Sequence, residues 1–418
     1  MKILIISYYS KPLNGVSSYR IESFCKEFVK LGANVTLLTR HWDEDFKSWD
    51  DLISSNKKEK YVTTKNGYRE VRVSFNSSKT SRFSSMITLK NYLSGNLHFE
   101  TDCYKNFKDE AFELLKGENN FDLVFVSSPP LNLVKLGYFL NKKMRIPFVV
   151  DFRDFFNNIH LLQSKAYSQN DLILWKISDF YLSRWLKKAL FISTVSKKLK
   201  TLFESKYRKP IVLAENGYDY EWFKNKEEIY VPNNIFTIRY IGSAYSHQDF
   251  TAITEGINLF CKKNKSKKIK VELIGLHNRD VEDYLNNQLV VNELSIVSER
   301  ISKQETIKKT INSDVLMLPW NNFDGVYGTK PFEYIASGSH VLLCPTDNDV
   351  IENLLRDYKN SSICSSSTEV YSTIYKEYDR WQKGGNKLFS HEFEHFSREK
   401  IAQKLYAEIS KKINAEKN

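Results

Sequence analysis

The sequence has few cysteines, and their placement excludes two kinds of small structural site. Five cysteines are scattered over 418 residues, with no C-x-x-C pair and no histidine cluster at metal-ligand spacing. Neither a disulfide framework nor a zinc site is therefore expected. This use of cysteine fits a reducing compartment, so we expect a cytoplasmic protein.

Long apolar segments and nucleotide-binding fingerprints are also missing. No stretch approaches the about 20 consecutive apolar residues that span a bilayer, and the apolar run at 3–6 is too short for a signal peptide. No P-loop occurs, and no G-x-G-x-x-G follows a strand pattern, which removes the usual motifs of ATPases and nicotinamide enzymes. The chain is expected to be soluble, or at most attached to a membrane surface.

Positive charge is in excess. Lys and Arg number 62 and Asp and Glu 50, which gives a formal net charge of +12. Such an excess suits nucleic acid, an acidic lipid surface or a phosphorylated substrate. Because no nucleic-acid-binding module is visible, we expect an anionic membrane surface or a phosphorylated substrate as partner, and no nucleic acid.

The N-terminal segment has the pattern of a βαβ unit. Residues 2–7 are continuously aliphatic, as in a strand that is buried on both faces of a parallel sheet. A helix at 18–31 has its apolar residues at helical spacing, and a second strand follows at 35–38. The same alternation of strands and helices continues up to the turn dipeptide Asn216-Gly217.

A second α/β series begins after a polar linker at 218–234, with a strand at 237–241. We predict the α/β class, with two Rossmann-like domains facing across a cleft. Their boundaries are predicted at 1–217 and 218–395, and a final helix at about 396–418 is expected to pack back on the first domain. In such open parallel sheets, ligands bind outside the carboxyl ends of the strands.

The most informative segment is DGVYGTKPFEYIASG at 324–338, which follows an apolar strand. Pro331 suits the first turn of a helix and Gly338 suits its end. A helix that begins at a strand's carboxyl end points its free N–H groups and its positive dipole end toward a bound phosphate. Glu333 can accept hydrogen bonds from sugar hydroxyls there, but an acid in the first turn also simply favours the helix, so both interpretations stay open.

The part of this segment at 329–338, TKPFEYIASG, resembles the signature near the C-terminus of group 1 glycosyltransferases, the family-four retaining enzymes. Other landmarks resemble that family in the same order along the chain: GVSSYR at 15–20, LGANV at 31–35, SSPP at 127–130, FVVDFRD at 148–154, VS at 195–196, ENGYD at 215–219, YIGSAY at 240–245 and FSRE at 396–399. The resemblance implies the GT-B arrangement of two Rossmann-like domains, a nucleotide-diphosphate sugar as donor substrate, no cofactor and no metal.

The resemblance also implies roles for residues on the donor side. The family's glutamate at the position of Glu333 holds the donor's ribose, and the backbone amides just before it meet the donor's sugar and phosphates. Where relatives carry a first glutamate this chain has Gly325, and Ser243 and His247 stand where many relatives place an Arg and a Lys. Lys330 or His247 is the expected partner of the diphosphate. The predicted donor-binding residues are Gly15, Gly242, Ser243, His247, Tyr327, Gly328, Thr329 and Glu333.

The DFRD segment at 151–154 resembles the family's acceptor-side strand. We predict acceptor binding by Asp151 and Arg153, whose guanidinium suits an acceptor's phosphate, and catalytic roles for Asp154 and Lys330. An acid at a strand end is also often a helix cap or the partner of a neighbouring arginine, and this alternative stays open.

The resemblance thus implies a retaining glycosyltransferase that moves a sugar to a hydroxyl of a saccharide or lipid-linked acceptor, in cell-envelope polysaccharide or glycolipid synthesis. The expected place is the cytoplasm, at the inner face of the membrane. A helix at 172–188 mixes tryptophans with lysines, which suits a membrane interface, although its apolar residues equally suit a core. Two alternatives remain: an epimerase or phosphorylase of the same architecture, and a basic nucleic-acid-binding protein.

Overall fold

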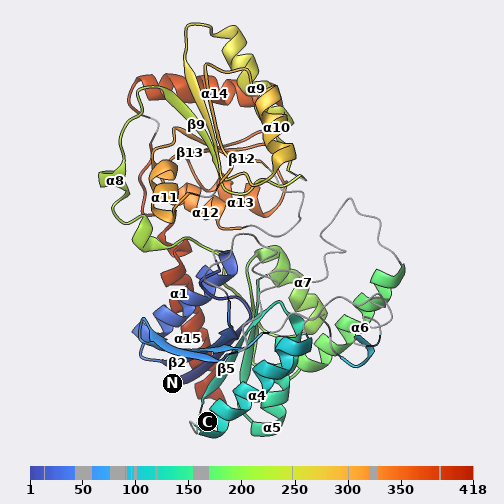
Figure 1. Cartoon of the computed structure of the whole chain (residues 1–418). Coiled ribbons are helices and arrows are strands. Elements are labelled where there is room, and N and C mark those ends of the chain that lie inside the picture. The colour runs from blue at the N-terminus through green and yellow to red at the C-terminus, as the bar shows by residue number, and fades with distance from the viewer. Residues whose placement is uncertain are drawn as a thin grey trace. The chain divides into compact units, whose positions relative to one another are not determined.

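The computed structural model describes residues 1–13, 15–42, 59–75, 90, 92–95, 97, 101–117, 121–153, 169–246, 248–299, 301–319, 328–385 and 387–417 (Figure 1). These residues form two compact units. Unit 1 contains the described residues from Met1 to Asn216 and those from Arg398 onward, and unit 2 contains the described residues of Gly217–Ser397. Each unit is an α/β body built on its own sheet.

Unit 1 contains an eight-stranded sheet in the order β3-β4-β2-β1-β5-β6-β7-β8. All neighbours in it are parallel except the hairpin of β3 and β4. The strands are β1 (Lys2–Ser7), β2 (Asn34–Arg40), β3 (Tyr61–Lys65), β4 (Tyr68–Val73), β5 (Leu123–Ser128), β6 (Phe148–Phe152), β7 (Ile192–Thr194) and β8 (Ile211–Leu213). The helices are α1 (Val16–Lys30), α4 (Thr101–Gly117), α5 (Leu131–Met144), α6 (Gln169–Leu186), α7 (Lys197–Tyr207) and α15 (Arg398–Lys417).

The central strands of unit 1 are buried on both faces, which explains their unbroken aliphatic sequences. On one face, Ile3 and Ile5 of β1 pack in a single cluster with Phe24 and Phe28 of α1. The last helix of the chain, α15, joins this cluster, and Figure 1 shows α1 and α15 on the same side of the sheet. The N-terminal half of the chain therefore completes its core with the C-terminal helix.

Unit 2 contains a six-stranded, fully parallel sheet in the order β11-β10-β9-β12-β13-β14. Its strands are β9 (Phe236–Ile241), β10 (Ile269–Ile274), β11 (Glu293–Val297), β12 (Val315–Leu318), β13 (His340–Leu343) and β14 (Ser361–Ile363). The helices are α8 (Lys226–Ile229), α9 (Thr251–Lys263), α10 (Arg279–Gln288), α11 (Lys303–Ile311), α12 (Lys330–Ala336), α13 (Val350–Arg356) and α14 (Ser367–Gln382), with short 3₁₀ turns at Tyr220–Trp222 and Glu394–Phe396.

Helices cover both faces of the sheet of unit 2. One core cluster joins the sheet to α9 and α14, and a second joins the opposite face to α11, α12 and α13. Successive residues of β9 alternate between them: Tyr240 lies in the first cluster and Ile241 in the second. The predicted α/β class with two Rossmann-like domains is confirmed.

In each sheet, the direction in which successive strands are added reverses at one central strand. In unit 2 the chain lays down β9, β10 and β11 outward to one side, then returns to the other side of β9 with β12. Unit 1 does the same around β1, which lies between β2 and β5. At such a switch point the loops after the two central strands part, and a crevice for a ligand opens at the carboxyl ends of the strands.

No helix among the described residues is both long enough and apolar enough to cross a membrane.

Candidate active site

The switch point of unit 2 brings together two segments that lie far apart in the sequence. Gly242 and Ser243 directly follow β9, and α12 begins at Lys330 in the connection after β12. The chain folds this way because Gly242 has φ +112°, a conformation that favours glycine, and because Pro331 sits in the first turn of α12.

Gly242 makes room for the Lys330 side chain. A Cβ at position 242 would lie 2.6 Å from Lys330 Cε and 3.1 Å from its Nζ. A side chain there would displace the flexible end of the lysine, in addition to the strain that the positive φ would impose on it. The glycine after β9 and the lysine of the TKPFEY segment form one structural unit.

The Lys330 ammonium group is held by β9 and by the loop that follows it. Lys330 Nζ donates to Tyr240 Oη at 2.6 Å and to the Ser243 carbonyl at 3.1 Å. It also lies 4.2 Å from the centre of the Tyr240 ring. The Tyr240 hydroxyl in turn donates to the Ser243 carbonyl at 2.8 Å. These partners are neutral dipoles, so they orient the ammonium group without neutralising it.

Burial controls the protonation of Lys330. Loss of hydration lowers the pKa of this lysine to about 7, and the nearby Glu333 carboxylate only partly opposes the shift. An anionic ligand at the ammonium group would reverse it, because opposite charges favour the charged form. Lys330 is thus suited to bind an anion: above about pH 7 it is mostly neutral in the free protein, and a bound anion would restore its positive charge.

Tyr334 fixes α12 against the end of β9. Its hydroxyl accepts from the Ile241 N–H at 3.2 Å and donates to the Ile241 carbonyl at 3.3 Å. The side chain is 2% exposed, and burial raises its pKa far above the ordinary value, so the hydroxyl stays protonated. The tyrosine of the EY pair is therefore a structural anchor that places Lys330 and Glu333.

Glu333 lies on the same short helix and pairs with a residue that the sequence analysis did not single out. This residue is Lys303, the first residue of α11, whose Nζ donates a hydrogen bond to Glu333 Oε1 at 2.6 Å. The glutamate side chain is 13% exposed and the lysine 25%. Lys303 therefore fixes the direction of a carboxylate that still reaches solvent.

In unit 1 the buried partner of Asp151 is Arg20 of α1. Asp151 is 0% exposed, and its two oxygens accept from Arg20 Nε at 3.0 Å and Nη2 at 2.8 Å. Ser193 Oγ donates to the same carboxylate at 2.7 Å, and Arg20 donates onward to the carbonyls of Ala214 and Glu215. A carboxylate enclosed in this way joins β6, β7, α1 and the end of β8, and it faces away from solvent.

Arg153 follows β6 and lies among aromatic rings. Its Nη2 donates to the Pro129 carbonyl at 2.9 Å, and its guanidinium carbon lies 4.9 Å from the centre of the Tyr9 ring. Tyr9 stacks on Trp42 with 5.9 Å between ring centres. The residue is 6% exposed, so this arginine is positioned by the protein and does not swing freely in solvent.

The structure distributes the predicted site residues over both units. Gly242, Ser243, Lys330 and Glu333 lie together in unit 2, with Gly328 and Thr329 just before α12. Gly15 caps the start of α1 in unit 1, with open space where a Cβ would stand. Asp154, His247 and Tyr327 lie outside the described residues. Sequence reasoning missed Tyr240, Lys303 and Arg20.

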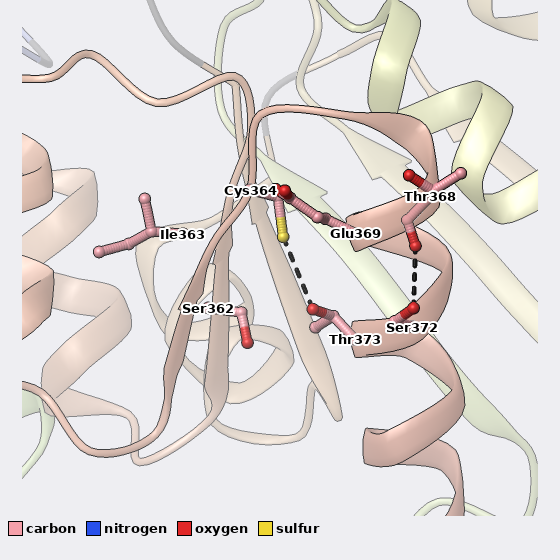
Figure 2. Close-up of a pocket in the computed structure, with 7 residues that line it drawn as sticks. All are labelled: Ser362, Ile363, Cys364, Thr368, Glu369, Ser372 and Thr373. Carbon is pink, nitrogen blue, oxygen red and sulfur yellow. Dashed lines mark hydrogen bonds between the residues drawn. The ribbon is translucent and has the colours of Figure 1, made fainter.

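A separate hollow lies at the other edge of the sheet of unit 2. It measures about 400 Å³ and opens between β14 and the first turns of α14 (Figure 2). Cys364 Sγ lies 3.6 Å from Thr373 Oγ1, and burial raises the pKa of this thiol, so it stays protonated and weakly nucleophilic. The hollow is remote from the switch point in strand order, and we assign it no catalytic role.

Comparison with known proteins rests on structure. No protein-family model and no curated protein matches the sequence. Among solved structures, a glycosyltransferase from Rickettsia africae matches with a TM-score of 0.62 and 15% identity, over 99% of this chain and 98% of that one. HepE from Anabaena in complex with UDP-glucose matches with a TM-score of 0.59 and 13% identity, over 98% and 100%. The trehalose-phosphate synthase from Burkholderia xenovorans in complex with glucose-6-phosphate matches at 0.63 and 9%, over 98% and 100%.

These matches extend over both units, and the matched proteins are GT-B glycosyltransferases. The chain has the GT-B fold. In this GT-B chain, Gly242 directly follows β9, and Lys330 and Glu333 lie on α12 after β12, at the switch point of unit 2. Identities of 9 to 15% show the fold alone and assign no role to a single residue.

The lowered pKa of Lys330 leads to a pH prediction for the binding of an anion at this lysine. If a nucleotide-diphosphate sugar binds here, its affinity should be constant below about pH 7 and should fall about tenfold per pH unit above it. The sign follows because the unliganded lysine loses its proton above pH 7, while the permanently charged diphosphate favours the protonated form. Calorimetry at pH 8 in two buffers should show proton uptake on binding.

A flat affinity profile between pH 6 and 9, with no proton uptake, would contradict this assignment of Lys330. The control is Lys330→Met, whose weaker binding should not depend on pH in this range.

Proposed function

We propose that this chain is a retaining glycosyltransferase that moves a sugar from a nucleotide-diphosphate sugar to an acceptor hydroxyl. The observation that carries the proposal is the arrangement at the switch point of unit 2. The absence of a side chain at Gly242 leaves room for Lys330 at the end of β9, and Glu333 follows on the same helix as Lys330. HepE, one of the GT-B proteins with a similar structure, was solved with UDP-glucose, which supports a donor of this class.

On the donor side, Lys330 would face the diphosphate. Its ammonium group is oriented by Tyr240 and Ser243, and a charge that is fixed before the reaction stabilises a departing diphosphate without reorganisation. The backbone amides of Gly328 and Thr329 precede it, and we assign to them, with His247 and Tyr327 outside the described residues, the remaining contacts to the donor's phosphates and sugar.

Glu333 would hold the donor's ribose. Lys303 binds its Oε1, which leaves Oε2 to accept from the vicinal hydroxyls. We therefore propose that Lys303 acts as a positioning residue: its hydrogen bond to Oε1 holds the carboxylate in one direction. No cofactor enters the proposal, and the nucleotide sugar is a substrate.

On the acceptor side, we propose that Arg153 binds a phosphate or sugar hydroxyl of the acceptor, supported by its fixed guanidinium, and that Asp154, outside the described residues, is catalytic. Asp151 was predicted to bind the acceptor. Because Arg20 and Ser193 enclose its carboxylate, we now propose that it acts on the acceptor only indirectly, through the backbone that leads to Arg153. Catalysis with retention would rest on holding the acceptor hydroxyl close to the anomeric carbon and on stabilising the leaving diphosphate.

The finer parts of the proposal concern place and acceptor. We propose a saccharide or lipid-linked acceptor in cell-envelope polysaccharide or glycolipid synthesis, at the cytoplasmic face of the membrane. The support is physical: a net charge of +12 attracts the protein to an anionic lipid surface.

A panel of nucleotide sugars tests the central proposal. A donor that binds the folded state should raise the melting temperature in a concentration-dependent way. Incubation of that donor with saccharide and lipid-linked acceptors should then give a glycoside with retained anomeric configuration. Rearrangement of the donor without any acceptor would indicate an epimerase, and phosphate-dependent cleavage of a glycoside would indicate a phosphorylase. Stabilisation by none of the nucleotide sugars would contradict the donor site.

Glu333→Gln should weaken donor binding by about tenfold or more. The substitution keeps the shape of the side chain but removes the charge, and hydrogen bonds to a charged acceptor are worth about 1.5 to 3 kcal/mol each. The melting temperature should change little, because a first-turn acid contributes only about 0.3 to 1 kcal/mol to its helix. Calorimetric affinity and a melting curve for the same sample give both values.

The matched control is Glu305→Gln, which removes another first-turn acid in unit 2, at the exposed start of α11. It should leave donor affinity unchanged. A Glu333→Gln protein that melts normally and binds donor as tightly as the wild type would rule out the ribose role.

A further inference from the structure

Helix α6 of unit 1 exposes a row of apolar side chains to solvent. Leu172 is 42% exposed, Ile173 50% and Phe180 64%, which are large fractions for residues of this kind. Leu172, Lys176, Phe180 and Arg184 follow one another at intervals of four residues, so they share one side of the helix, and Ile173 lies beside Phe180. We call these five residues the α6 face.

The orientation of α6 is fixed by its other side. Ser178, Leu182, Trp185 and Leu186 are at most 3% exposed, and they alternate with the α6 face at helical spacing. The helix packs against α5 within unit 1, at the border of the unit in Figure 1. Helix α6 therefore already has a core contact through its buried side, and the exposed apolar residues lie outside that contact.

Basic residues accompany the exposed apolar side chains. Lys176 and Arg184 lie in the same row and are exposed, and Lys187 and Lys188 are exposed directly after the helix. Asp179, next to Phe180, is bound to Lys206 of α7 at 2.7 Å, so its charge is compensated. The α6 face is thus apolar and positively charged at once.

We propose that the α6 face docks on an anionic membrane. The inference rests on the membrane association proposed above and names the surface that carries it. A lipid surface fits this chemistry because Leu172, Ile173 and Phe180 can enter the boundary between headgroups and acyl chains. At the same time, the long side chains of Lys176 and Arg184 can reach the anionic headgroups with their charged ends. A folded acidic partner would need a complementary cavity for each protruding side chain, whereas a fluid lipid surface adapts to all of them.

Cosedimentation with vesicles tests the proposal. Wild-type protein should bind vesicles of phosphatidylcholine with phosphatidylglycerol and should bind pure phosphatidylcholine weakly. The triple variant Leu172→Ser/Ile173→Ser/Phe180→Ser should lose at least tenfold in partitioning, because it removes the inserted apolar surface. The double variant Lys176→Gln/Arg184→Gln should lose about fivefold per charge and most of the preference for the anionic lipid.

Matched controls change the same chemistry elsewhere. Val290→Ser removes an apolar side chain that is 71% exposed in unit 2. Lys262→Gln/Lys265→Gln removes two exposed charges from the basic run at the C-terminal end of α9. Both should bind vesicles like the wild type. Donor affinity should be normal in every variant, so a failure of docking can be told apart from a failure of the glycosyltransferase proposal.

Three results would overturn the inference. The first is wild-type protein that does not bind anionic vesicles even at low salt. The second is α6 variants that bind as well as the controls do. The third is a self-association in solution that the triple variant abolishes, which would assign the face to a second copy of the chain. If the triple variant does not fold, the charge variant, which changes only exposed side chains, still decides.

Discussion

Lys330→Met should reduce sugar transfer by about 100- to 1000-fold while the protein stays folded. The loss is expected because the substitution removes the one described cation that the end of β9 holds beside Gly242, where we place the leaving diphosphate. Removing a preorganised group that stabilises transition-state charge typically costs this much in rate. The melting temperature should stay the same or rise, because burial already disfavours the charged form of Lys330 in the free protein.

Two further variants sharpen this experiment. Lys308→Met, on the exposed side of α11 in the same unit, is the matched control and should transfer sugar at the normal rate. Gly242→Ala should mimic Lys330→Met in part, because its Cβ would lie 2.6 Å from Lys330 Cε and would displace the side chain. If Lys330→Met retains more than half of the wild-type rate, the diphosphate must be neutralised by another group.

Asp151→Asn should destabilise unit 1 by about 3 to 5 kcal/mol. The substitution leaves Arg20, which is 2% exposed, buried without its counter-charge, and breaking a buried pair from one side has this cost. Urea unfolding followed by circular dichroism should show the transition of unit 1 at a clearly lower denaturant concentration. Replacing both partners, as in Arg20→Met/Asp151→Leu, should recover much of the loss, since apolar residues of similar volume then fill the space.

The experiment also separates the two interpretations of Asp151. If the carboxylate binds the acceptor directly, as the sequence suggested, Asp151→Asn should unfold like the wild type and should raise the KM for the acceptor. The control Glu204→Gln breaks the exposed pair with Lys200 on α7 and should cost less than about 1 kcal/mol.

The strands of both sheets were predictable because a parallel strand buried on both faces needs an unbroken aliphatic sequence, as in β1, β9 and β12. Two strands, β11 and β14, lack such a sequence. Strand β11 has the sequence ELSIV, lies at an edge of its sheet and is only partly buried, so its pattern is mixed. Strand β14 has the sequence SSI, so it lacks an aliphatic run.

The candidate site was predictable only where one segment holds it. Lys330 and Glu333 could be predicted as site residues because both lie in the single TKPFEY segment. Pro331 and Gly338 mark the start and the end of its helix, α12. Their partners could not be seen: Tyr240 lies 90 positions before Lys330, and Lys303 lies 30 before Glu333. The enclosure of Asp151 depends in the same way on Arg20, 131 positions away, and only the folded chain brings the two together.

The packing of α15 on unit 1 has a consequence for biosynthesis. Ile401, Leu405 and Ile409 of this helix belong to the same core cluster as β1 and α1, yet the ribosome makes them after the whole of Gly217–Ser397. At about 5 to 20 residues per second, the first unit waits on the order of ten seconds or more for its last helix. During that interval its apolar face is open to chaperones. A nascent chain stalled before Arg398 should therefore be far more sensitive to protease in unit 1 than the released protein.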